Sequence, residues 1–241
     1  MYFRVLSLMA SAALIAGCLR VPILYAPPAA QIPISAETGE GELAFHWGKN
    51  GIDLNGSYSP VEHLELTALG SYFDRLDDSL EHSKHSYMEL GAAGYTELAE
   101  SVTGSFSAGV GFGDATGVGG EDDTTQPGAG LRTVSGSYLR PFAQLGLGYA
   151  RPRRGEGPFD ILELGVAARL AWVRFASLQG PEGTRSAEGL FLEPLAIGRI
   201  GYNAVQLEVQ TGFTVQYGSS DVKAIESFST IGLHLSLNEI F

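Results

Sequence analysis

The chain has 241 residues, with 27 Asp and Glu against 15 Lys and Arg, so its formal net charge is −12. This acidic balance disfavours nucleic acid as a partner, because a phosphate backbone requires a surface rich in Lys and Arg. The single cysteine excludes a disulfide framework. Glycine, at 32 residues, is roughly twice as frequent as the usual 7 % or so, and the mean hydropathy of +0.07 is high for a chain with 17 % charged residues. Together these features argue against disorder, a coiled coil or a helical bundle. The length fits one domain.

The first 17 residues have the layout of a secretory signal peptide. One basic residue, Arg4, precedes an apolar run that is too short to span a bilayer. The run closes on Leu-Ile-Ala-Gly-Cys at residues 14–18, which resembles the lipobox of bacterial lipoproteins. The resemblance implies that Cys18 receives the lipid and becomes the mature N-terminus, and Leu19 after it implies sorting to the outer membrane. An ordinary signal peptide with a chance cysteine is the alternative.

Residues 18–41 contain four prolines and show no lasting periodicity. Such a segment is predicted to be an extended, lipidated N-terminal tether.

From residue 42 to residue 241 apolar and polar residues alternate in runs that turn-rich gaps separate. This period of two is typical of strands that have one apolar and one polar face. We therefore predict an all-β fold, an antiparallel up-and-down β-barrel of about ten strands. Eight is the alternative, because the first hairpin, around Lys49, is short. The ten runs are 42–48, 51–59, 63–74, 86–97, 101–113, 136–150, 159–176, 189–201, 204–217 and 228–241.

The charged residues indicate which face of the strands points inward. Inside the runs they are carboxylates and Arg, whereas Lys occurs in the gaps at Lys49, Lys84 and Lys223. Arg suits a crowded network of ion pairs better than Lys does, so we predict a polar lumen and a transmembrane barrel with an apolar outside. Side chains nearly fill barrels of this size, which favours a structural ion-pair network over a pore. Its predicted members are Glu65, Glu89, Arg140, Glu163, Arg169, Glu193, Arg199 and Glu208.

The connections and the last strand indicate the orientation. Short gaps alternate with longer polar ones, an asymmetry typical of outer-membrane barrels, and an even strand number then places both termini in the periplasm. Residues 231–241, with their alternation and terminal Phe, resemble the closing strand of bacterial outer-membrane barrels, and residues 58–64 resemble the first tight periplasmic turn of small ones. The resemblance implies a Gram-negative source. It also implies outer-membrane lipid, the barrel-assembly machinery and the lipoprotein-sorting machinery as partners.

The segment 74–85 gathers carboxylates and imidazoles, among them Asp77, Asp78, His82 and His85. Such a cluster could contact a cation at the surface, or act on envelope substrates as barrel-embedded proteases do with Asp and His at the outer rim. A solvated acidic loop is the simpler interpretation. The glycines at 109–113 lack the Lys-Ser/Thr pair of a phosphate loop and are expected to make room for long Arg and Glu side chains that cross the lumen.

The sequence therefore predicts a lipid-anchored outer-membrane β-barrel protein with a non-enzymatic structural, surface or binding role. No catalytic residue, metal or cofactor is assigned, and no extracellular ligand is specified. Two alternatives remain open: an envelope hydrolase acting through the loop 74–85, and a lipocalin-like periplasmic carrier of an apolar ligand.

Overall fold

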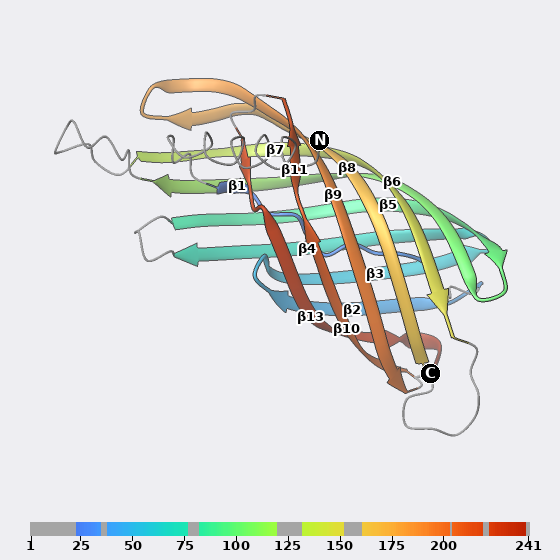
Figure 1. The fold of residues 1–241 in the computed structure, drawn as a ribbon. Helices are drawn as coiled ribbons and strands as arrows, with labels where there is room; N and C mark the ends of the chain where they lie inside the picture. The colour runs from blue at the N-terminus through green and yellow to red at the C-terminus, as the bar shows by residue number, and fades with distance from the viewer. Residues whose placement is uncertain are drawn as a thin grey trace, which may run out of the picture.

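The computed structural model describes residues 23–34, 38–76, 82–119, 132–151, 161–202, 204–218 and 222–239. Among them, no helix is long and apolar enough to cross a membrane. The chain forms one antiparallel barrel (Figure 1), whose strands are β2 Gly41–Gly48, β3 Gly51–Val61, β4 Leu64–Leu76, β5 His82–Ala99, β6 Val102–Gly119, β7 Arg132–Ala150, β8 Ile161–Gly180, β9 Gly183–Tyr202, β10 Val205–Phe213 with its continuation β11 Val215–Tyr217, and β13 Ser227–Ser236. Two short strands, β1 Ile23–Tyr25 and β12 Lys223–Ala224, pair separately, and a 3-10 turn, Leu237–Glu239, follows β13.

The barrel is closed. Each strand pairs antiparallel with its neighbour along the chain, and β13 pairs with both β10 and β2, so the sheet closes on itself. The predicted fold class is confirmed, with ten strands rather than eight. The short first hairpin does form, with Gly48 opposite Gly51.

Several strands are longer than the alternation predicted. The run 86–97 lies within β5 His82–Ala99 and 189–201 within β9 Gly183–Tyr202, while 101–113, apart from its first residue, is covered by β6 Val102–Gly119. Most of the extra residues lie at one end of the barrel, opposite to the end at which β13 terminates. The outward side chains there are polar, as at Lys84, so the alternation disappears although backbone pairing continues.

The two ends of the barrel differ, and we name them by their connections. The short-turn rim holds the connections 62–63, 100–101, 151–160 and 203–204 and the end of β13. The opposite, long-loop rim holds 49–50, 77–81, 120–131, 181–182 and 218–226.

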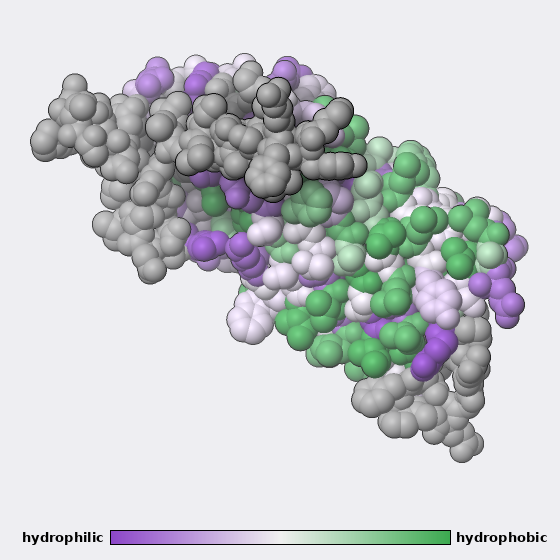
Figure 2. Space-filling view, in the orientation of Figure 1, coloured by the Kyte–Doolittle hydropathy of each residue, from purple (hydrophilic) through white to green (hydrophobic). Residues whose placement is uncertain are grey.

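The outer face carries a continuous apolar belt. On β6 six outward positions run from Val102 to Phe112. These ten residue steps cover about 33 Å of strand, or roughly 25 Å of height at the usual tilt. Figure 2 shows hydrophobic residues gathered over the face formed by β9, β10 and β13. Aromatic side chains occur at both edges of the belt, namely Tyr58, Tyr149 and Tyr202 toward the short-turn rim and Trp47, Tyr72 and Trp172 toward the long-loop rim.

Glycines in the wall lie beneath large inward-facing rings. A Cβ at Gly111 would collide with the Tyr87 hydroxyl, one at Gly109 with the Phe142 ring, and one at Gly113 with the Tyr138 ring. The room that these glycines make is therefore taken by aromatic rings, whereas the sequence predicted Arg and Glu.

The lumen contains the N-terminal part of the chain itself. Residues 23–34, which we call the insert, are buried almost throughout, with Tyr25 and Ala29 fully inaccessible. The insert starts with β1, which pairs in parallel with β12 near the long-loop rim, and continues without regular structure. The sequence assigned this segment to the tether and gave no indication that it lies inside the barrel.

Candidate functional site

Polar side chains of the barrel wall bind the backbone of the insert. Gln210 binds it twice, since its Oε1 accepts from the Ala30 N–H at 3.0 Å and its Nε2 donates to the Ala30 carbonyl at 2.9 Å. The Asp53 carboxylate accepts from the Ala29 N–H at 3.0 Å, and the Asn50 amide donates to the Pro27 carbonyl at 2.8 Å. Further along, Gln144 donates to the Gln31 carbonyl and Thr103 to the Ile34 carbonyl. A buried backbone needs such partners, and here the lumen supplies them.

The composition of the insert suits this environment. Pro27, Pro28 and Pro33 have no N–H, which reduces the number of buried donors that need a partner. The small side chains of Ala26, Ala29 and Ala30 let the backbone approach the wall closely enough for these hydrogen bonds.

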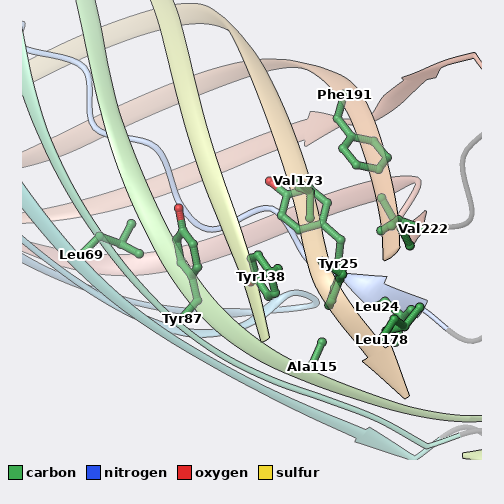
Figure 3. Packing of buried hydrophobic residues seen from close by; sticks show 13 residues of the cluster. Leu24, Tyr25, Leu69, Tyr87, Ala115, Tyr138, Val173, Leu178, Phe191 and Val222 are labelled. Carbon is green, nitrogen blue, oxygen red and sulfur yellow. The ribbon is translucent and has the colours of Figure 1, made fainter. Parts of the chain in front are cut away.

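The first end of the insert is anchored in an apolar cluster near the long-loop rim. Leu24 and Tyr25 pack with residues from several strands, among them Tyr138, Leu178 and Phe191 (Figure 3). The Tyr25 ring stacks on Phe191 with 5.1 Å between the ring centroids. This end therefore lies against the part of the wall that rises toward the long-loop rim.

The second end packs into another apolar cluster near the short-turn rim. Ile32 and Ile34 join Ala167, Leu195 and Ile197 there. Gly146, Gly148 and Gly165 face the two isoleucines, and a Cβ at Gly148 would lie 3.0 Å from Ile34. Small residues in the wall thus create the space that the insert fills.

The first charged group of the lumen centres on Arg140. Its guanidinium lies 2.5 Å from the Glu89 carboxylate and 2.9 Å from the Glu193 carboxylate, with all three side chains buried. The Tyr25 hydroxyl donates to Glu193 at 2.5 Å, and the Arg140 guanidinium lies 5.5 Å from the centre of the Tyr25 ring. Tyr87 also donates to Glu89. The insert is therefore part of this charged group.

The second charged group lies on the side of β8 to β10. Arg199 pairs with Glu208 at 2.5 Å and with Glu163 at 3.2 Å. The His46 ring lies 2.6 Å from Glu208, and Gln210, which holds the insert, donates to the same carboxylate. One polar network thus connects the wall with the backbone of the insert.

The structure places the other two predicted lumen residues less centrally. Arg169 donates to Gln144, lies over the Phe142 ring at 4.8 Å, and approaches Glu89 only to 3.9 Å. Glu65 is 2 % exposed and belongs to neither charged group. All eight predicted lumen residues are buried. Six of them form the two charged groups, Arg169 lies beside the first group, and Glu65 lies apart from both.

The histidines of the predicted surface cluster do not converge. His82 is half exposed and lies 2.7 Å from Asp74, whereas His85 is buried, hydrogen-bonded to Tyr138 on the lumen side of β5. Asp77, Asp78 and Cys18 lie outside the described residues. Among the residues described, no group of three or more His, Cys, Asp and Glu side chains could hold a metal ion.

Sequence reasoning missed the side chains that hold the insert, chiefly Tyr25, Gln144 and Gln210. One signal was present in β8. Its inward residues Ala171, Val173 and Phe175 are apolar although its outward face is apolar too. A strand with two apolar faces needs cover on both, and the insert supplies it on the inner one.

These features define a closed ten-stranded antiparallel barrel whose polar lumen is filled by its own N-terminal segment. No protein-family model matches the chain, and no curated protein matches it. Among solved structures, the chain is similar to OmpT (in-vitro folded), an outer membrane protein of Vibrio cholerae. The identity is 8 % and the TM-score 0.17, over 85 % of this chain and all of that chain, values at which the likeness carries no argument.

Proposed function

We propose that the chain is an outer-membrane β-barrel protein of a Gram-negative bacterium with a non-enzymatic structural, surface or binding role. The observation that carries the proposal is the inverted distribution of polarity. Buried charged groups around Arg140 and Arg199 occupy the inside, while an apolar belt of roughly 25 Å, edged with aromatic residues, covers the outside. In water such an exterior would be an aggregation surface, and in a bilayer it is the required one.

The orientation follows from the connections and from the strand ends. At the long-loop rim three of the five connections have five to twelve residues, namely 77–81, 120–131 and 218–226, whereas at the other rim three of the four are two-residue turns and only 151–160 is longer. Strands β4 to β9 also extend beyond the belt at the long-loop rim, with polar outward residues such as Asp74, Lys84 and Thr116. Outer-membrane barrels place this side outside the cell and their short turns in the periplasm. The C-terminal strand then ends at the periplasmic rim, and the long-loop rim is the surface available to extracellular partners.

The filled lumen supports a role other than diffusion through the barrel. The insert, its hydrogen bonds to Gln210 and Gln144, and the two apolar clusters at its ends occupy the path between the rims. The charged lumen also removes support from a lipocalin-like carrier, which requires an apolar cavity. We further propose that Cys18 carries a lipid, which strengthens membrane attachment.

The test is the gel mobility of the full chain extracted from outer membranes and loaded with and without boiling. We expect that detergent is needed for extraction and that the unboiled protein migrates faster, since the closed barrel resists the detergent. A Cys18→Ser variant separates the two attachments, because the barrel alone should keep it in the membrane fraction. Recovery of that variant in the soluble fraction, without a mobility shift, would contradict the proposal.

A further inference from the structure

The insert has a direction that the contacts at its two ends define. At Ile34 the backbone carbonyl accepts a hydrogen bond from Thr103, the second residue of β6, and Gly148 near the end of β7 faces the side chain. Both strand ends belong to the short-turn rim. The insert therefore leaves the lumen at that rim and continues into β2.

The other end of the insert lies at the opposite rim. Ile23 pairs with Lys223 and Tyr25 with Ala224, within the connection between β11 and β13. Leu24 packs with Leu178, two residues before β8 ends at the long-loop rim. Asn50, in the β2–β3 hairpin of that rim, binds the insert further along, at Pro27. Residues 23–26 thus lie beyond the level of this hairpin, against the longer strands.

We infer that the insert is threaded from the outside inward, so that its first residue, Ile23, lies at the extracellular rim and its last residue, Ile34, at the periplasmic rim. The inference rests on the proposed function, which makes the long-loop rim the outer one. It differs from the expectation that both termini lie in the periplasm. The end of β13 stays on the periplasmic side, whereas the start of the insert lies on the extracellular side.

The threading limits where a lipid on Cys18 could insert. Cys18 lies outside the described residues, and five residue steps separate it from Ile23. Five steps span at most about 18 Å, less than half of the 40 Å or so that the eleven steps of the insert can cover at the same rise. While the insert occupies the lumen, a lipid on Cys18 cannot reach the periplasmic leaflet through the barrel.

Hydrogen bonds make this threading specific rather than a loose filling of the lumen. Their partners follow one another along the insert from Asn50 and Asp53 through Gln210 to Gln144 and Thr103. A reversed insert would present donors and acceptors in the opposite order and would place Leu24 and Tyr25 away from Phe191 and Tyr138.

Labelling of introduced cysteines with a membrane-impermeant maleimide on intact cells tests the inference. Three full-length variants are compared with the parent, in which Cys18 is the one cysteine of the sequence. Ile23→Cys reports on the start of the insert, Glu182→Cys on the exposed β8–β9 turn of the long-loop rim, and Glu62→Cys on the exposed β3–β4 turn of the short-turn rim. The parent measures any reaction of Cys18 itself.

We expect Ile23→Cys and Glu182→Cys to be labelled on intact cells as fully as on permeabilised ones, and Glu62→Cys only after permeabilisation. Labelling of Ile23→Cys should be slower than that of Glu182→Cys, because the side chain at position 23 is partly buried against Phe73 and Ile225. If Glu182→Cys is labelled on intact cells and Ile23→Cys only after permeabilisation, the threading is wrong and the proposed function stands. If Glu62→Cys is labelled on intact cells and Glu182→Cys is not, the orientation in the proposed function fails, and the inference fails with it.

Discussion

At the residue scale, we expect Arg140 to be a lumen residue whose replacement strongly destabilises the barrel. It neutralises two buried carboxylates, Glu89 and Glu193, and packs on the Tyr25 ring of the insert. Arg140→Ala leaves both carboxylates without their cation, so we expect the free energy of unfolding to fall by about 3–5 kcal/mol. Urea unfolding of the refolded protein in detergent, followed by the heat-dependent gel shift, measures the loss.

The matched control for Arg140 is Arg174, an exposed arginine on β8 that lies 5.9 Å from the Trp172 ring. Removing an exposed charge of this kind costs about 1 kcal/mol or less. Equal losses for Arg140→Ala and Arg174→Ala would mean that the lumen pairs do not hold the barrel together.

Gly111 shows why a residue without a side chain matters beside these charges. In the barrel register it lies between Glu89 and Arg140, and the Tyr87 hydroxyl covers it. A methyl group there must displace Tyr87, and with it the hydrogen bonds to Glu89 and Arg140. We expect Gly111→Ala to destabilise the barrel by about 1–3 kcal/mol. Gly70→Ala should be nearly neutral in the same unfolding measurement, since nothing lies within 4 Å of its added Cβ. Equal effects would exclude this role of Gly111.

The burial of the lumen charges could be predicted from the sequence, but their pairing could not. Alternation places Glu89 and Arg140 on the polar face of their strands, and the absence of Lys from those faces indicates that they are enclosed. Whether Glu89 meets Arg140 depends on the stagger of β5, β6 and β7, which fixes one register among several that preserve alternation. Glu65 lies on the correct face and still forms no ion pair with any residue that the structure describes, for the same reason.

At the element scale, the insert is the feature that the sequence did not indicate. A proline-rich segment without periodicity has the same composition whether it hangs in solvent or lies in a lumen. The difference is made by the wall, through Gln210, Gln144 and the glycines facing Ile32 and Ile34. These partners come from β7 to β10, more than 100 residues away along the chain, so no local pattern could reveal them.

Deletion of residues 23–34 should convert the closed barrel into a conducting one. Six buried carboxyl groups, on Asp53, Glu65, Glu89, Glu163, Glu193 and Glu208, then line the lumen against the three arginines Arg140, Arg169 and Arg199. We expect a steady, cation-selective conductance in planar bilayers, because a pore lined by excess negative charge attracts cations.

The full chain is the control for this deletion and should give no steady conductance. The heat-dependent gel shift establishes that the deleted form is still a barrel. A folded deletion variant as silent as the full chain, or a full chain that conducts equally, would contradict the assignment of the insert as the element that closes the lumen.

At the scale of the whole molecule, the strand number and the direction of the faces followed from alternation, since a closed barrel repeats one pattern in every strand. The positions at which the strands end could not be predicted from alternation. At the long-loop rim β5, β6 and β9 continue beyond the belt into a polar environment, where pairing persists without the alternation that reveals it. The gap lengths predicted two different rims, but the extension of these strands beyond the belt and the direction of the insert are properties of the folded barrel.

The two tryptophans of the chain, Trp47 and Trp172, test the central claim most directly. Both point outward near one edge of the belt, at 65 % and 38 % exposure. The measurement is tryptophan fluorescence of the refolded protein in vesicles made with brominated lipids, beside a sample in ordinary lipids titrated with iodide. The account predicts strong quenching by the brominated chains and little by iodide, because lipid covers both rings. Quenching by iodide with none from the brominated lipids would place the belt in water and contradict the membrane barrel.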